Sequence, residues 1–115
     1  MQVLNEIETR VLEEMLRNCN AEEQVLDINS NKPLVFHKEH KQLSFIIKGN
    51  GYAQVGEEIY PVYRGCLILF PENTNHSFLC VEGDMTVLHL HAPKIVGDED
   101  WYMLQETSEK WRPFL

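Results

Sequence analysis

The five histidines of this chain all lie between residues 37 and 91. Alternate residues of a strand share one face, so His40 and Gln42 have the parity of Ser44 and Ile46 in the strand that follows, and His89 and His91 share a face of another strand. Neutral imidazole is a preferred ligand of borderline divalent transition metals. If these side chains point into the interior of a barrel, they predict a metal centre there. A hydrogen-bonding pocket for a small ligand and purely structural histidines are the alternatives.

Short segments of alternating apolar and polar residues, separated by turn residues, must position these side chains. The expected strands cover residues 25–28, 43–48, 52–55, 59–63, 66–70, 76–81 and 85–91. Gly49-Asn50-Gly51 and residues 71–75 are typical turns between them. Links this short exclude parallel pairing, which needs long crossovers. The pattern predicts an all-β fold, either a barrel or a sandwich.

The N-terminal residues 2–18 have a different periodicity. Apolar residues recur at intervals of three and four, and acidic and basic residues fill the opposite side, which predicts an amphipathic helix. The apolar side needs a covering surface, either the barrel or a second copy of the chain. We expect residues 1–20 to form this helix and residues 21–115 to form a single domain.

The strand pattern weakens after Pro93. Residues 97–100 are typical of a helix start and would begin a short helix that carries Trp101 and Leu104, with a strand as the alternative. Two large aromatic residues, Trp111 and Phe114, lie close to the C-terminal end. We expect both to be packed against the domain, because leaving them in water is unfavourable.

Composition excludes several classes of function. The 115 residues carry a net charge of -8 and no basic cluster, which argues against nucleic acid and acidic membrane surfaces as partners. The three cysteines form no CxxC pair, which argues against a disulfide framework and a cysteine zinc site. No signal peptide is evident, and the longest apolar run is too short to span a membrane. A cytoplasmic protein is therefore expected.

The segment from Gly65 to His76 resembles the second conserved motif of the cupin family, which has Gly, five residues, Pro, one residue, Gly, two residues and His. Asn73 stands at the second Gly of that motif, and both residue types tolerate a left-handed turn. Residues 37–49 resemble a degraded first motif that ends at Gly49. The resemblance implies a double-stranded β-helix, the jelly-roll barrel of cupins, and a homodimer.

The same resemblance implies which residues bind a metal. His76 matches the ligand of the second motif, whereas in the first motif Gln42 replaces the usual Glu and Val35 replaces one His. The implied ligand set is therefore neutral, which suits Zn, Ni, Fe, Mn or Cu better than Mg or Ca. The candidate ligands are His37, His40, Gln42 and His76, with His89 and His91 as possible substitutes from the last strand.

Three classes of function follow from these observations. The main hypothesis is a metal-dependent enzyme of the dioxygenase or isomerase type that acts on a small polar substrate. The alternative is a metal-free sensor of a small molecule, because the run from Leu43 to Gly51 followed by that from Pro71 to Phe78 also resembles the effector-binding domain of AraC-type regulators, without their DNA-binding part. The third is an interaction module. The expected partners are a small molecule and a second copy of the chain.

Overall fold

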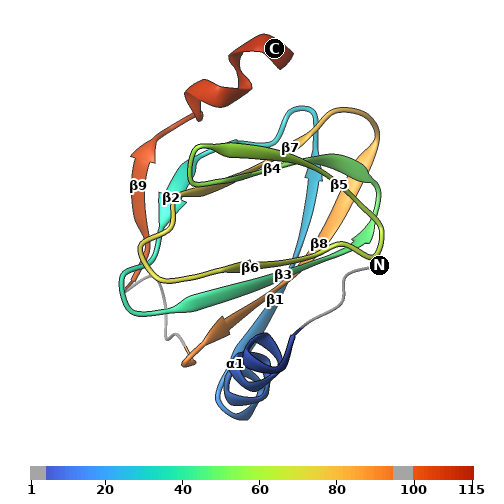
Figure 1. Cartoon of the computed structure of the whole chain (residues 1–115). Coiled ribbons are helices and arrows are strands. Elements are labelled where there is room, and N and C mark those ends of the chain that lie inside the picture. The colour runs from blue at the N-terminus through green and yellow to red at the C-terminus, as the bar shows by residue number, and fades with distance from the viewer. Residues whose placement is uncertain (1–4, 95–99) are drawn as a thin grey trace.

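The computed structural model describes residues 5–94 and 100–115, which form two facing antiparallel sheets with an α-helix and a short 3₁₀-helix outside them (Figure 1). One sheet has the strand order β1-β8-β3-β6 and the other has the order β5-β4-β7-β2-β9. The strands are β1 (Asn20–Asp27), β2 (Leu34–Phe36), β3 (Lys41–Lys48), β4 (Asn50–Val55), β5 (Glu58–Tyr63), β6 (Leu67–Phe70), β7 (His76–Cys80), β8 (Asp84–Ala92) and β9 (Tyr102–Gln105). The predicted all-β jelly roll with an N-terminal helix is confirmed.

The interior between the sheets changes from apolar to polar along β3 and β8. In β3, the inward residues are Gln42, Ser44 and Ile46, as the alternation predicts, and all three are buried. Their partners on β8 are His91, His89 and Val87 in the same order. Apolar side chains therefore fill one end of the barrel, and amide, hydroxyl and imidazole groups occupy the other.

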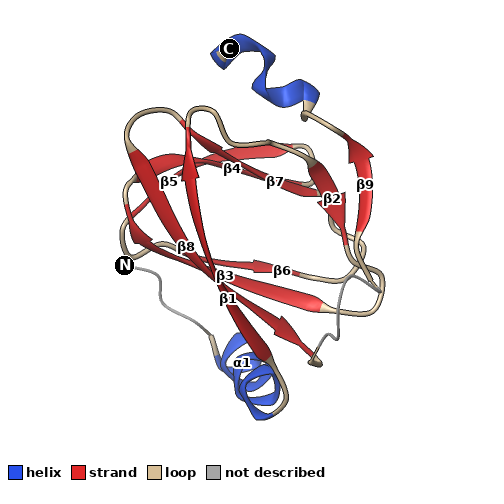
Figure 2. Cartoon of the chain, turned by 180° about the vertical axis from the view of Figure 1, so that it is seen from behind, coloured by secondary structure: helices blue, strands red, loops and turns tan. Residues whose placement is uncertain are grey.

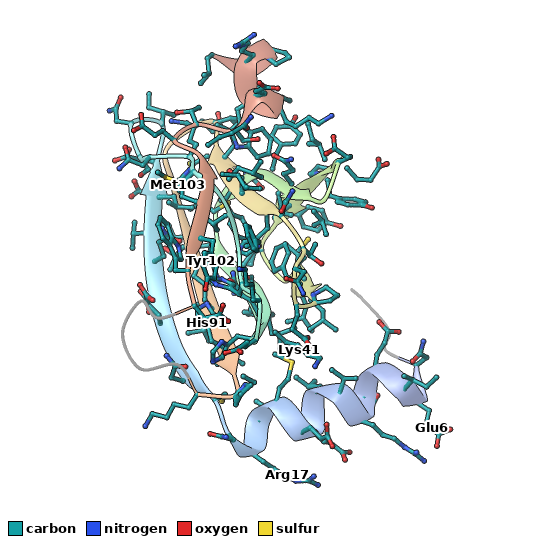
Figure 3. All side chains as sticks on the ribbon, turned by 90° about the vertical axis from the view of Figure 1, so that its left-hand side faces the viewer. Glu6, Arg17, Lys41, His91, Tyr102 and Met103 are labelled. Atoms are coloured by element: carbon teal, nitrogen blue, oxygen red, sulfur yellow. The ribbon has the colours of Figure 1, made fainter. Side chains whose placement is uncertain are left out.

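Helix α1 (Glu6–Arg17) covers part of the outer face of the four-stranded sheet (Figure 3, where its two end residues are labelled). It begins with a capping box, in which the side chains of Asn5 and Glu8 each accept a hydrogen bond from the other's main-chain N–H. Met15 is buried against Leu43 and Ala92. The helix thus packs on its own barrel, one of the two expected arrangements. No helix in the described residues is long and apolar enough to cross a membrane.

Three predicted segments differ from the structure. The first strand starts at Asn20 rather than at residue 25, and β2, with only three residues, was not predicted. The segment after Trp101 is the edge strand β9, which was the alternative to a short helix. The predicted helix start at residues 97–99 and residues 2–4 of the predicted N-terminal helix lie outside the described residues.

The C-terminal residues pack on the outside of the five-stranded sheet, as expected (Figure 2). The 3₁₀-helix η1 (Glu109–Phe114) places Trp111 at 0% exposure, with its indole N–H donating to Ser77 Oγ at 2.8 Å. The ring of Phe114 lies 4.9 Å from that of Tyr52. This aromatic contact holds the outer face of β4 and β7, so β7 is supported from outside where it presents His76 to the interior.

Candidate functional site

The side-chain amide of Gln42 lies at the centre of the buried polar cluster. Its Oε1 atom is 3.1 Å from Nε2 of His37 and 3.1 Å from Nε2 of His91. Its Nε2 atom is 2.9 Å from Ser44 Oγ and 3.1 Å from Nδ1 of His89. One amide therefore connects three imidazoles and a hydroxyl, and all of its polar atoms are engaged.

The turn before β7 positions two of the histidines. Asn73 adopts a left-handed conformation with φ of 61°, as expected from its place in the cupin-like motif, and its N–H donates to the main-chain oxygen of His37 at 2.6 Å. His76 follows this turn and donates from Nδ1 to the main-chain oxygen of Thr74 at 3.0 Å. The rings of His37 and His76 lie 5.1 Å apart, so the turn brings the two imidazoles together.

Asp100 connects the C-terminal segment to the residues around His37. Its main-chain oxygen accepts a hydrogen bond from Nδ1 of His37 at 2.6 Å. Its carboxylate accepts bonds from the N–H groups of Lys38 and Glu39, both at 2.8 Å, and from Nδ1 of His40 at 2.5 Å. Burial alone raises the pKa of the Asp100 carboxyl, but these hydrogen bonds outweigh burial and hold that pKa below its usual range.

The hydrogen atoms of His37 limit what can lie beside it. A main-chain oxygen only accepts, so Nδ1 of His37 carries a hydrogen, and Nε2 of the neutral ring is left with a lone pair. With Oε1 of Gln42 facing that nitrogen, two lone pairs meet at 3.1 Å. The contact is favourable if a cation lies between the two groups, either a proton on Nε2 or a metal ion nearby. It is also favourable if the amide is turned over, because N and O of the amide occupy equivalent positions.

Burial keeps the imidazoles of His76, His89 and His91 neutral at neutral pH. It lowers the pKa of His76 to about 4, despite the hydrogen bond to Thr74, and lowers the pKa of His91 to about 4. For His89, burial lowers the pKa to about 3, and the neighbouring imidazoles act in the same direction. Neutral rings present lone pairs, which is the form that binds metals and accepts hydrogen bonds.

A cavity of about 280 Å³ opens beside this cluster. His37, Gln42, His76, His89 and His91 line its inner part. Its outer part is lined by exposed side chains, namely Glu22 and Gln24 of β1, Asn31 of the loop after β1, and Trp101, which precedes β9. Figure 3 shows the labelled His91 on the side of the barrel that β9 borders with Tyr102 and Met103.

A larger cavity of about 710 Å³ lies between α1 and strands β5 and β6. Leu12, Met15, Leu67 and Leu69 are among its mostly apolar lining residues, and none of the five histidines lines it. Without imidazoles or a buried carboxylate, its wall offers little for catalysis or metal binding. The histidine cavity, although smaller, is the candidate functional site.

The structure brings together three of the four candidate ligands, His37, Gln42 and His76. His40 precedes β3 and lies against Asp100, so it does not line the cavity. His91, expected only as a substitute, contacts Gln42 directly. Within the described residues, no group of three or more His, Cys, Asp or Glu side chains is arranged so that it could hold a metal ion.

Comparisons with known proteins agree with this fold. Residues 24–92 match the family model described as Cupin domain, and a search of curated protein sequences finds no match. Among solved structures, a PAC13 variant from Streptomyces with uridine aligns with a TM-score of 0.67 and 18% identity, over 81% of this chain and 73% of that chain. KdgF from Halomonas sp. aligns with a TM-score of 0.65 and 21% identity, over 70% and 73% of the two chains. Ectoine synthase from P. lautus aligns with a TM-score of 0.64 and 18% identity, over 79% and 69%. At these identities the likeness shows a shared fold.

Proposed function

The chain belongs to the cupin family, and we propose that it binds a divalent transition metal at the histidine cluster and acts there on a small polar substrate. The proposed ligands are His37, His76 and His91, with Oε1 of Gln42 as an additional donor. Zn, Ni, Fe, Mn and Cu all suit a set of imidazoles with one neutral oxygen. The ligand set differs from the prediction by having His91 in place of His40.

One observation carries this proposal. Nδ1 of His37 donates to the main-chain oxygen of Asp100, which leaves Nε2 of the ring directed at the side-chain amide of Gln42, 3.1 Å away. His76 has the same arrangement, with Nδ1 bound to a main-chain oxygen and Nε2 left as a lone pair. Metal-bound histidines commonly donate their second ring nitrogen to a carbonyl or carboxylate in this way. The donor chemistry fits a metal, although the imidazoles must move closer to close the site.

A metal at this place would supply Lewis acidity to a bound carbonyl or hydroxyl oxygen. The chain's own residues would then orient the substrate and exclude water. Phe70 packs on His76 with ring centres 4.6 Å apart and keeps one side of the cluster apolar. His89 bonds to Ser44 Oγ at 2.7 Å and to Gln24 Oε1 at 2.8 Å, so it lies between the cluster and the open end of the cavity. His89 thus links the cluster to Gln24 at that end.

A metal-free binding site is the second candidate, and the same amide supports it. If the Gln42 amide is turned over, its NH₂ group donates to Nε2 of both His37 and His91, and its oxygen accepts from Ser44. The contacts of Gln42 with His37, His91 and Ser44 are then all favourable without a cation, and His89 is paired as well if the amide of Gln24 is also turned over. In that case the cavity would bind an organic ligand by hydrogen bonds alone, as a sensor domain would.

Two of the similar structures favour an enzyme over a sensor. Pac13 is described as a nucleoside dehydratase, and another similar protein as ectoine synthase. Both descriptions name enzymes that act on small polar molecules. A dioxygenase or isomerase activity remains the specific hypothesis for this chain.

Metal titration tests the proposal. Untagged protein, first stripped with EDTA, is titrated with Zn²⁺ and Ni²⁺ by calorimetry, and we expect one site per chain that His76→Ala abolishes. Gln42→Glu is expected to tighten metal binding at least about tenfold, because a carboxylate adds a charge-assisted bond. Absence of stoichiometric binding in both wild type and Gln42→Glu would refute the metal proposal and leave the metal-free site.

A matched pair of variants identifies the remaining imidazole. His91→Ala removes the ring that contacts Gln42, whereas His40→Ala removes the ring that contacts Asp100. We expect His91→Ala to lose most of the metal affinity and His40→Ala to retain most of it. The reverse order would restore the ligand set predicted from the sequence.

A further inference from the structure

The open end of the histidine cavity is lined by side chains that the metal proposal does not use. They are Glu22 and Gln24 of β1, Asn31 of the following loop, and Trp101, which directly precedes β9. The first three are exposed, and Trp101 is 46% exposed. Together they offer a carboxylate, two amides and a large aromatic surface at the entrance of a cavity whose inner wall is formed by the histidine cluster.

The register of β1 explains why Glu22 faces this entrance. Glu22 pairs with His89 of β8, whose side chain points inward, so Glu22 lies on the same face of the sheet. Gln24 lies two residues further along this face and accepts a hydrogen bond from Nε2 of His89 at 2.8 Å. Glu23, between them, lies on the opposite face. The entrance and the histidine cluster are therefore directly connected through Gln24.

Charge limits which ligands can enter. The described residues that line the cavity include no Lys or Arg, and Glu22 is the only carboxylate among them. A phosphate or carboxylate group would meet this negative charge with no side-chain cation to offset it. Adjacent hydroxyl groups, in contrast, donate to a carboxylate and exchange hydrogen bonds with amides, as acidic residues do with ribose hydroxyls in dinucleotide sites.

Shape and aromatic surface limit the ligand further. About 280 Å³ lies just below the usual range of about 300–1,000 Å³ for drug-sized ligands, which suits a single small molecule rather than a polymer. Trp101 leaves almost half of its surface uncovered, whereas the other tryptophan, Trp111, is fully buried. An open indole at the entrance is a platform on which a planar ring can stack.

We propose that this cavity takes an uncharged molecule of nucleoside size, whose adjacent ribose hydroxyls bind Glu22 and the neighbouring amides while its planar ring stacks on Trp101. The inference rests on the proposed function only in placing the ligand in the same cavity, and it holds with or without a metal. It assigns Glu22 and Trp101 to substrate selection, and it excludes phosphorylated substrates.

Four probes separate the parts of this proposal in calorimetric and saturation-transfer NMR titrations. Uridine carries both the planar ring and the adjacent hydroxyls, 2′-deoxyuridine lacks one hydroxyl, methyl riboside lacks the base, and uridine 5′-monophosphate adds the charge. We expect uridine to bind and each of the other three to bind at least about tenfold more weakly. The two truncated probes lose one charge-assisted hydrogen bond or one stack, and the monophosphate meets the charge of Glu22 without a cation to offset it. Equal or tighter binding of the monophosphate, or no binding of uridine, would overturn the proposal.

Matched variants test the two assigned residues. Glu22→Gln is expected to weaken uridine binding about tenfold and to reduce the discrimination against the monophosphate, whereas Glu23→Gln, the same change on the other face of β1, should alter neither. Trp101→Ala should lose at least about fivefold in affinity and Trp101→Phe should retain most of it. Unchanged uridine affinity in both Glu22→Gln and Trp101→Ala would refute the assignment, provided that both variants unfold at wild-type urea concentrations.

Running each titration on EDTA-stripped and on Zn²⁺-loaded protein separates this inference from the proposed metal site. Uridine binding to the stripped protein would support the ligand class even if no metal binds. Stoichiometric Zn²⁺ binding without uridine binding in either form would leave the metal site in place and refute the ligand class.

Discussion

Replacing Asp100 by alanine should destabilise the whole domain, because this carboxylate connects two distant parts of the chain. Asp100 is only 5% exposed and accepts three hydrogen bonds, two from main-chain N–H groups and one from the imidazole of His40. Lys38 and Glu39, which carry the two N–H groups, are exposed residues, so water can replace the lost acceptor there. Each of these bonds is therefore worth about 1 kcal/mol.

The bond with His40 contributes more, because the His40 side chain is only 13% exposed and water does not readily replace the lost carboxylate there. A bond to a charged group contributes about 1.5–3 kcal/mol. Asp100→Ala should therefore lower the free energy of unfolding by about 4 kcal/mol, a large part of the ~5–15 kcal/mol typical of a domain. Asp100→Asn, which keeps one acceptor oxygen but loses the charge, should lose about half as much.

Urea unfolding followed by tryptophan fluorescence measures both changes. Glu72→Ala is the matched control, since Glu72 forms an ion pair with Lys41 at 3.0 Å in which both side chains are more than one-third exposed. Such exposed pairs contribute at most about 1 kcal/mol. If Asp100→Ala unfolds within about 0.5 kcal/mol of the wild type, or no lower than Glu72→Ala, the structural role assigned to Asp100 is wrong.

The pH dependence of this effect has a defined sign. The folded-state pKa of Asp100 is held below its usual value, so its contribution to stability is fully present above about pH 4, the pKa of Asp in an unfolded chain. The contribution is lost as the pH falls through the folded-state pKa. The difference in unfolding free energy between wild type and Asp100→Ala should therefore shrink as the pH falls below about 4.

Three further predictions follow from particular contacts. Gly49→Ala should lower the free energy of unfolding by about 3 kcal/mol or more, because a Cβ atom there would lie 2.2 Å from a main-chain oxygen of β8. Gly56→Ala, also at positive φ but with no atom within 4 Å of the added Cβ, should lower it by about 1 kcal/mol. Equal urea midpoints for the two variants would contradict this prediction. Trp111→Phe should cost about 1–3 kcal/mol in the same assay, since it removes the hydrogen bond to Ser77 and leaves a void, and a change below 0.5 kcal/mol would contradict the packing role given to η1. In EDTA-stripped protein, unfolding free energy should fall as the pH drops below about 6.5, because burial lowers the pKa of His89 to about 3 and the unfolded chain takes up the proton first. Each histidine with a lowered pKa contributes up to about 1.4 kcal/mol per pH unit to this fall in unfolding free energy. A free energy of unfolding that does not change between pH 7 and 5 would contradict the prediction.

The alternation within a single strand predicts which residues share a face. Gln42, Ser44 and Ile46 do share one face of β3, and the structure turns that face to the interior, beside His89. The contact between Gln42 and His91 was not predicted, because it depends on the register between β3 and β8, which are more than thirty residues apart in sequence. Period-two patterns fix the face of a residue but contain no information on its partner across the sheet.

The position of Asp100 illustrates what a sequence pattern cannot reveal. Its hydrogen bonds join it to residues about sixty positions earlier, and no periodicity relates the two segments. His40 was grouped with Gln42 because the alternation was extended one residue beyond the start of β3 at Lys41. In the turn the backbone leaves the strand conformation, so the imidazole turns toward Asp100 instead of the cavity. The homodimer, which followed from the family resemblance alone, stays a prediction.

Gln42 is the residue on which the two candidate functions differ. A carboxylate at this position could only accept hydrogen bonds, so it would need a metal or bound protons to lie among three neutral imidazoles. An amide both donates and accepts, so it can bond to His37 and His91 on one side and to Ser44 on the other without any cation. The change from the Glu of the cupin motif to Gln therefore uncouples the folding of the cluster from metal binding. It lowers the affinity expected for a metal, and it allows the same cavity to stay ordered for an uncharged organic ligand when no metal is bound.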